Sequence, residues 1–185
     1  MMTELSLNVL DVAQNSVSAR ASLIEISVDC YTNRDLMEIR IKDNGCGMSQ
    51  QQLDSVCDPF FTTRTTRKVG LGVSFFKQAA ESAGGMFSIT SKVGEGTEVY
   101  ASFCISNIDR MPLGDMTMTM HSLITLNDNI DFIYRYRIDD REFTLDTREL
   151  KAILGDVPFS EPEVSQYIRE YLSENKREVD GEIII

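Results

Sequence analysis

The stretch IRIKDNGCGM, residues 39–48, places an acidic residue and two closely spaced glycines directly after an alternating apolar run. The segment LMEIRIKD, residues 36–43, predicts a β-strand because apolar and charged residues alternate along it. Asp43 then stands at the strand end, where a carboxylate is a good acceptor for an exocyclic amine. Gly45 and Gly47 would let a ligand touch the backbone closely. Taken alone, the stretch is slightly more typical of a tight turn, since Asp-Asn-Gly sequences are common in turns.

Upstream, residues 4–20 are predicted to form a helix, with apolar residues at helical spacing and Thr3 as the N-cap. Five polar residues recur at steps of four, three, four and three and therefore share one stripe of this helix. A solvated surface face would explain such a stripe on an isolated helix. The segment is nearly apolar elsewhere, which indicates a buried helix whose polar stripe faces something. The stripe consists of Glu4, Asn8, Asp11, Asn15 and Ser18.

Downstream, DPFFTTRTTRKVGLG, residues 58–72, gathers three cations ahead of a Gly-Leu-Gly that opens a predicted helix over residues 70–83. Glycines at a helix N-terminus offer free N–H groups and the positive end of the helix dipole, a natural phosphate site. Cations just before it would suit a triphosphate. A single Gly-x-Gly and a basic run are each weak signals, because basic runs are usually only solvated. The residues concerned are Arg64, Arg67, Lys68, Gly70 and Gly72.

The remaining pattern predicts five more strands and several helices. SLIEISVDCY, MFSITS and TEVYASFCI read as strands, and the last two are joined by a Gly-bearing hairpin turn. Residues 50–56 read as a short helix that Ser49 would cap. After residue 106 the pattern changes to a Met-rich helix, a β-hairpin over residues 130–146 and two further helices. These helices are predicted over residues 147–154 and 161–174, the second with a capping box from Ser160 and Glu163. We therefore divide the chain into residues 1–106 and a C-terminal extension, residues 107–185.

Bulk composition excludes several classes of protein. The chain has 185 residues, 29 acidic and 18 basic, a formal net charge of -11 and 42% hydrophobic residues, which is typical of a soluble globular chain. Its acidity argues against general binding of nucleic acid or anionic membranes. There is no apolar run long enough for a membrane helix and no signal peptide, so we expect a cytoplasmic protein. Four separated cysteines and the single His121 argue for reduced thiols and against a metal-thiolate site.

The order and spacing of these motifs are more specific than any one of them. A polar-striped helix with Asn15, a strand followed by DNGCGM, then DPFF, GLG opening a helix, and GEGT before a strand resemble the N, G1, F, G2 and G3 boxes of the GHKL superfamily. That superfamily includes gyrase B, the heat-shock chaperone, histidine kinases and the mismatch-repair ATPase. The resemblance covers residues 5–105. It implies the Bergerat fold, an α/β (α+β) sandwich with a mixed, mostly antiparallel sheet and helices on one face, here with a C-terminal α/β appendage.

The resemblance also implies a role for each matched position, with ATP and Mg²⁺ as cofactors. Asn15 would hold Mg²⁺, Asp11 would be the general base for the attacking water, and Asp43 would accept the adenine amino group. Thr97 would assist through a bridging water, and residues 62–69 would act as the ATP lid. The ATP-binding set that follows is Asn15, Asp43, Gly45, Gly47, Met48, Phe60, Arg64, Arg67, Lys68, Gly70, Leu71, Gly72 and Thr97.

Three departures from the superfamily pattern bear on function. Asp11 is one methylene shorter than the usual glutamate, Lys68 replaces the first glycine of the histidine-kinase box, and the lid is short. Three hypotheses remain open: a slow ATPase switch that acts on a protein partner, a protein kinase that phosphorylates a partner in trans, and a nucleotide sensor without chemistry. A self-contained histidine kinase is disfavoured because the boxes begin at the N-terminus and His121 lacks the flanking residues of a phosphoacceptor.

Overall fold

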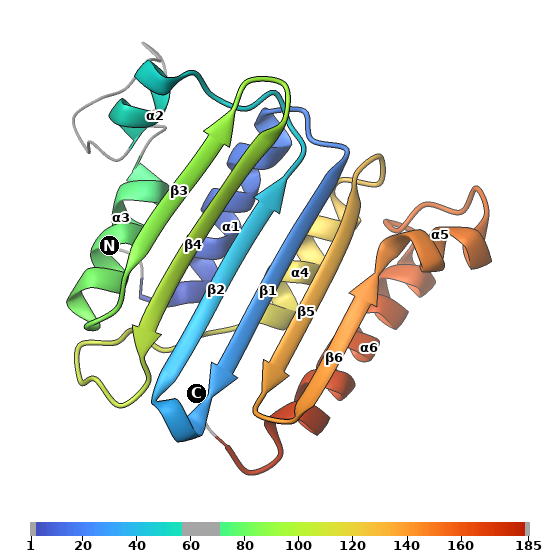
Figure 1. The fold of residues 1–185 in the computed structure, drawn as a ribbon. Helices are drawn as coiled ribbons and strands as arrows, with labels where there is room; N and C mark the ends of the chain where they lie inside the picture. Colours follow the sequence, from blue (N-terminus) through green and yellow to red (C-terminus); the bar gives the residue numbers. More distant parts are fainter. Residues whose placement is uncertain (1–2, 57–70, 184–185) are drawn as a thin grey trace.

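The computed structural model describes residues 3–56 and 71–183 (Figure 1). Its centre is a six-stranded sheet with the order β3-β4-β2-β1-β5-β6. All neighbouring strands are antiparallel except β1 and β5, which run parallel. The strands are β1 Leu23–Tyr31, β2 Leu36–Asp43, β3 Phe87–Lys92, β4 Gly96–Cys104, β5 Asp131–Ile138 and β6 Arg141–Asp146.

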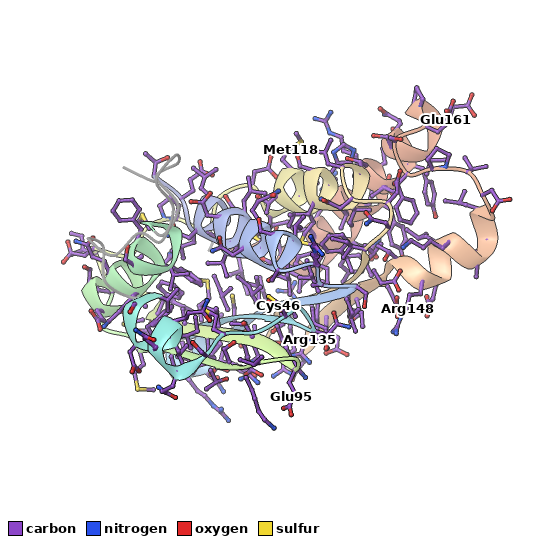
Figure 2. All side chains as sticks on the ribbon, turned by 90° about the horizontal axis from the view of Figure 1, so that it is seen from above. Cys46, Glu95, Met118, Arg135, Arg148 and Glu161 are labelled. Carbon is purple, nitrogen blue, oxygen red and sulfur yellow. The ribbon has the colours of Figure 1, made fainter. Side chains whose placement is uncertain are left out.

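The long helices lie on one face of this sheet and leave the other face uncovered by the described helices (Figure 1). Viewed at right angles, α1 and α4 lie on one side of the strands, and Arg135 lies on the uncovered face (Figure 2). The fold predicted from the sequence is therefore confirmed: a mixed, mostly antiparallel sheet with helices on one face. The helices are α1 Leu5–Ser18, α2 Gln50–Val56, α3 Leu71–Ser82, α4 Met116–Thr125, α5 Thr147–Leu154 and α6 Pro162–Asp180, with a 3₁₀ turn at Thr32–Arg34.

The hydrophobic core fills the space between the sheet and its helices. On the first helix, α1, the buried residues Leu5, Val9, Val12 and Ser16 recur at helical spacing and form one buried face. Along most of strand β1, buried residues alternate with partly exposed ones. Cys30 is on the buried side, and burial raises the pKa of its thiol to about 12. Such a thiol stays protonated near neutral pH and is chemically inert.

The start of α1 differs from the prediction. Thr3 is not the N-cap; Glu4 occupies that position, and its side chain makes no capping hydrogen bond. The first amides of α1 are instead satisfied by distant backbone, because Leu5 N and Ser6 N donate to the carbonyls of Pro112 and Leu113 at 3.0 and 2.8 Å. A segment from beyond residue 106 thus replaces the local cap.

The last helix also differs from the prediction at both ends. It begins at Pro162, with Glu161 as N-cap, so the capping box expected from Ser160 and Glu163 does not form. Proline fixes φ at a helical value and lacks the N–H that a first-turn residue could not use, so it starts the helix itself. The helix continues beyond the predicted end to Asp180, where buried Val179 anchors the last turn.

Residues beyond 106 join the same sheet and the same core as the residues before them. Strand β5 pairs with β1 along its whole length, and α4 packs against α1. The division at residue 106 stays a prediction, but the strands on its two sides are neighbours in one sheet. None of the helices in the described ranges is long and apolar enough to cross a membrane.

Candidate functional site

One edge of the sheet collects the residues that the sequence singles out. Strand β2 ends at Asp43 on this edge, and the antiparallel β4 begins there, so Asp43 and Thr97 are direct cross-strand partners. Strand β1 starts on the same edge, since Asp43 also lies opposite Ile24. Antiparallel pairing therefore brings the DNGCGM and GEGT motifs together although they are far apart in the sequence.

Asp43 is almost fully buried, and its carboxylate is held from two sides. One oxygen, Oδ1, accepts the backbone N–H of Gly45 at 2.8 Å. The other, Oδ2, accepts the hydroxyl of Ser16 on α1 at 2.6 Å. These two hydrogen bonds fix the orientation of the carboxylate. Because a carboxylate oxygen accepts more than one hydrogen bond, the group can still accept one from a further donor. Ser16 was missed as a site residue; its only signal was a polar residue at the spacing of the buried face.

A second hydroxyl, that of Ser91, organises the other side of the site. It accepts the backbone N–H of Met48 at 2.8 Å and donates to the carbonyl of Gly96 at 2.9 Å. The hydroxyl of Thr97 lies 2.8 Å from the same oxygen. Since the single hydroxyl proton of Ser91 is committed to Gly96, Thr97 donates to Ser91. Thr97 keeps its lone pairs for another partner, and Ser91 is a further residue that the sequence reading missed.

The two glycines of DNGCGM have packing reasons of their own. Gly47 has a φ of +64°, and a Cβ there would lie 2.0 Å from the carbonyl oxygen of Lys92. At Gly45, a Cβ would come within 2.9 Å of the Cβ and carbonyl oxygen of Ala19 at the end of α1. Both positions exclude a side chain through contacts inside the chain, before any ligand is considered.

A cavity of about 310 Å³ opens between α1, the sheet edge and the loop after β2. Its walls are more apolar than polar, with six polar side chains among the sixteen lining residues, which suits a flat ring with a polar edge. Five predicted site residues line it together: Asn15, Asp43, Gly47, Met48 and Thr97. The remaining described lining residues are Val12, Ser16, Ser18, Ala19, Ile41, Cys46, Gln52, Val56, Val73, Ile89 and Val99.

The apolar walls and Cys46 were not predicted as site residues. Cys46 is an exposed free thiol on the loop that carries the two glycines. Periodicity in the sequence marks residues such as Ile89 and Val73 as core positions and gives no sign that they face a cavity. The sequence therefore predicted Asn15, Asp43 and Thr97 among the polar groups of the cavity and missed Ser16, Gln52 and most of its apolar walls.

Other predicted site residues lie beside the cavity or outside the described residues. Asp11 and Gly72 do not line it but meet next to it, because a Cβ on Gly72 would lie 2.9 Å from the Cβ of Asp11 and 3.0 Å from its Oδ2. Gly45 lies behind Asp43, and of Leu71 only the backbone is described, as the first residue of α3. Phe60, Arg64, Arg67, Lys68, Gly70 and the whole lid, residues 62–69, lie outside the described residues.

The contact between Asp11 and Gly72 places the N-terminus of α3 against the polar stripe of α1. Partial desolvation raises the pKa of the Asp11 carboxyl above its usual value, although the side chain is still exposed to solvent. Asn15, one turn later, is exposed and lines the cavity. An amide oxygen with a carboxylate one turn away suits Mg²⁺, which takes one or two protein ligands and otherwise keeps water or phosphate oxygens. The residues present therefore fit the expected metal.

The geometry defines an α/β protein with a ligand cavity at one edge of its sheet, and comparison with known proteins gives its family. The pattern of histidine kinase-, DNA gyrase B-, and HSP90-like ATPases matches residues 1–107. The chain belongs to this family. The resemblance stated from the sequence is thereby confirmed.

Individual relatives share part of the chain. Sensor protein DegM of Bacillus sp. (strain B21-2) is 31% identical over 96 residues, which covers 52% of this chain and 26% of the relative. Sensor histidine kinase YxdK of Bacillus subtilis (strain 168) is 30% identical over 90 residues, which covers 46% and 27%. The chain spans 16% to 27% of the length of the first curated relatives it matches.

Solved structures also share the fold. The N-terminal domain of a DNA repair protein superposes with a TM-score of 0.55 at 16% identity, over 78% of this chain and 52% of that one. At this identity the likeness shows the fold alone.

Proposed function

We propose that the chain binds Mg-ATP in the cavity beside Asp43 and acts as a slow ATPase switch on a protein partner. The observation that supports this best is the buried carboxylate of Asp43, held by Ser16 and Gly45 at the end of an apolar cavity. In that place it would accept the exocyclic amine of adenine, and Thr97 would bond the ring through water. The apolar walls would hold the ring by exclusion of water.

The phosphate end would lie toward α3 and the polar stripe of α1. The positive end of the α3 helix dipole would favour an anion there. Asn15 would hold Mg²⁺, which supplies charge neutralisation for the phosphates. Asp11 would orient the attacking water and take its proton; its raised pKa makes it a better proton acceptor than an ordinary aspartate.

A second candidate is phosphoryl transfer to a partner protein. It is favoured by the relatives that carry the names of a sensor protein and a sensor histidine kinase. The only histidine of the chain, His121, is half-buried, and its Nε2 lies 2.9 Å from the hydroxyl of Ser165 on α6. That contact disfavours His121 as an acceptor, so the phosphoryl group would go to another protein.

Charge and composition bear on partner and place. The net charge of -11 disfavours nucleic acid and anionic membranes, so we propose a protein as the partner. The free thiols of Cys30, Cys46 and Cys104 support a reducing compartment, and we propose the cytoplasm.

The deciding experiment incubates the chain with γ-labelled Mg-ATP and counts free phosphate against labelled protein. Asp11→Asn should keep nucleotide binding and lose phosphate release by about 10²–10⁴-fold, because an amide cannot take a proton from water. Asn15→Ala should weaken Mg²⁺-dependent binding as well as turnover. Gln14→Ala, an exposed neighbour on α1, is the matched control and should change neither.

The three hypotheses give different results. Release of free phosphate supports the switch, and label on an added partner without free phosphate supports the kinase. Tight binding with neither would leave a sensor without chemistry. If the wild-type chain binds no ATP, the proposed function is wrong.

A further inference from the structure

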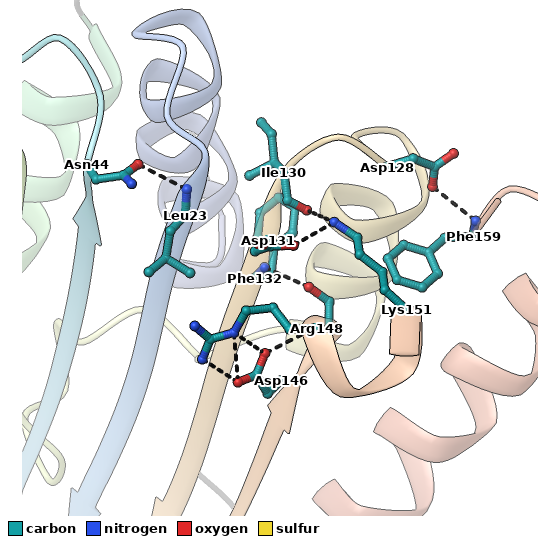
Figure 3. A network of polar contacts seen from close by, with 11 residues as sticks. Leu23, Asn44, Asp128, Ile130, Asp131, Phe132, Asp146, Arg148, Lys151 and Phe159 are labelled. Atoms are coloured by element: carbon teal, nitrogen blue, oxygen red, sulfur yellow. Dashed lines mark hydrogen bonds and ion pairs between the residues drawn. The ribbon is translucent and has the colours of Figure 1, made fainter. Parts of the chain in front are cut away.

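The residue after Asp43 is engaged away from the cavity. The side-chain oxygen of Asn44 accepts the backbone N–H groups of Ser22 and Leu23 at 2.9 and 3.0 Å, and the second of these bonds is drawn in Figure 3. Its Nδ2 donates to the hydroxyl of Ser22 at 2.9 Å. The backbone N–H of Asn44 adds a bond to the carbonyl of Leu23 at 3.3 Å. The turn that carries Asp43 is thus fastened to the start of β1 by four hydrogen bonds.

The same point of β1 is fastened to the C-terminal part of the chain. The carbonyl of Ser22 accepts the backbone N–H of Asp131, the first residue of β5, at 2.9 Å. Leu23 and Asp131 are register partners in the parallel pair β1–β5. Ser22 therefore stands between Asn44 on one side and the start of β5 on the other.

The start of β5 is held in turn by α5. The ammonium group of Lys151 lies 2.6 Å from Oδ1 of Asp131 and 3.1 Å from the carbonyl of Ile130 (Figure 3). The buried hydroxyl of Thr147 accepts the next amide, that of Phe132, at 2.8 Å. A side-chain clamp from residues 147–151 thus fixes the two residues at which β5 begins.

We propose that residues 147–151 position the Asp43 turn through Asp131, Ser22 and Asn44, so that the C-terminal part of the chain sets the nucleotide affinity of the cavity. Lys151 and Asn44 are positioning residues in this assignment and touch no ligand. If the clamp loosens, the turn after Asp43 samples more positions, and binding must then restore its order at a cost in affinity. The proposal rests on nucleotide binding in the cavity. A partner that contacts residues 147–151 would thereby regulate that binding.

The first test compares the Mg-ATP affinity of variants at two lysines in the C-terminal part of the chain, each of which forms an ion pair with an aspartate. Lys176 forms an ion pair with Asp180 at 2.6 Å, the same distance as the pair of Lys151 and Asp131, and the two lysine side chains are similarly exposed at 23% and 32%. Lys176→Met is therefore the matched control for Lys151→Met. Calorimetry should show Mg-ATP affinity reduced roughly two- to tenfold in Lys151→Met and unchanged in Lys176→Met. Lys151→Arg keeps the charge and should restore the affinity.

The second test measures hydrogen exchange, and its comparisons between variants need no nucleotide. Lys151→Met should speed hydrogen exchange at the amide of Leu23, which bonds Asn44 and not Lys151. Conversely, Asn44→Ala should speed exchange at the amide of Asp131, while Asn44→Asp, which keeps the acceptor oxygen, should not. In wild type, added Mg-ATP should slow exchange at Asp131, since coupling between two sites is reciprocal.

The outcomes separate the two proposals. If wild type binds no ATP, the proposed function fails, and the exchange experiment still decides whether the connection exists. If wild type binds ATP but Lys151→Met equals Lys176→Met in affinity and in exchange at Leu23, the inference is overturned. An equal affinity loss in both lysine variants would show a general effect of stability and would also overturn it.

Discussion

At the residue scale, we propose that a single carboxylate, that of Asp43, sets the choice of base. Both oxygens of Asp43 are already bonded inside the chain, to Gly45 and to Ser16, so the group cannot turn away from the cavity. Adenine offers it an amine, whereas guanine presents an oxygen at the same place and would be repelled. The selectivity expected from Asp43 is therefore electrostatic and depends on the position of the carboxylate, which Ser16 fixes.

Replacing Asp43 should remove the preference for adenine. A hydrogen bond to a charged group is worth about 1.5–3 kcal/mol, which corresponds to roughly ten- to a hundredfold in affinity. We expect Asp43→Ala to lose ATP affinity by that factor and to leave the weak binding of GTP almost unchanged, as measured by calorimetry. Glu98→Ala, on the uncovered sheet face, is the control. Equal affinity of wild type for ATP and GTP would contradict the assignment.

Asp11 should affect stability with a sign set by its pKa. Partial burial raises the folded-state pKa of this carboxyl above the unfolded value. Folding therefore disfavours the charged form of Asp11 relative to the neutral form. Its contribution to stability is present below the unfolded pKa and is lost as pH rises through the folded pKa. Because the Asp11 side chain is still exposed to solvent, water screens most of this penalty, so we expect Asp11→Asn to be more stable than wild type at pH 7 by less than about 0.5 kcal/mol. Urea unfolding at pH 7 and pH 3 measures this, and an advantage that grows toward pH 3 would contradict it.

The sequence predicted the candidate ligand-binding residues better than the residues that hydrogen-bond to them and fix their positions. Asn15, Asp43 and Thr97 come together in one cavity, as their motifs indicated. Their supports act across long separations: Ser16 bonds a residue 27 positions away, and Ser91 bonds Met48 across 43 positions. Such contacts leave no local signal, because the sequence around one partner does not indicate which distant residue it will bond.

At the scale of elements, the packing of α1 on α3 brings the parts of the site together. The helices predicted from the sequence are present, and the first of them was predicted from periodicity, since an apolar stripe at a spacing of three to four indicates a helix. The ends were less predictable: α1 takes its cap from Pro112 and Leu113, and α6 starts at its own proline. Helix ends depend on partners or on single residues, which periodicity does not report.

Gly72 tests that packing. A Cβ at this position would lie 2.9 Å from the Cβ of Asp11, closer than real contacts allow, so Gly72→Ala must push α3 away from α1. In a free helix the same change would stabilise by about 1 kcal/mol. Here we expect destabilisation by about 1–3 kcal/mol in urea unfolding, with weaker nucleotide binding. Gln78→Ala, on the exposed face of α3, should change stability by less than about 0.5 kcal/mol. A more stable Gly72→Ala would show that the two helices do not touch as described.

At the scale of the whole molecule, pairings between distant segments decide the architecture. The three local pairs, β1–β2, β3–β4 and β5–β6, follow from turns that the sequence displays. The pairs β2–β4 and β1–β5 join segments far apart and could not be read from local patterns. The C-terminal residues thus became an extension in the sequence reading, whereas the structure places their strands beside β1.

This arrangement predicts one cooperative unit instead of two. A chain cut after residue 106 would expose the edge of β1 to water and lose the buried residues Leu113, Met116 and Leu123. It would also leave the first amides of α1 without the carbonyls of Pro112 and Leu113, and each buried unpaired amide costs about 1–3 kcal/mol. These losses are comparable to the whole stability of a small domain, about 5–15 kcal/mol. We therefore expect residues 1–106 alone to lack a cooperative unfolding transition.

In the full chain, circular dichroism at 222 nm should give a single urea transition, with the same opening free energy from hydrogen exchange for amides of β2 and β5. Two separated transitions, or a truncated chain that unfolds cooperatively and binds ATP, would show that residues 107–185 are an independent unit.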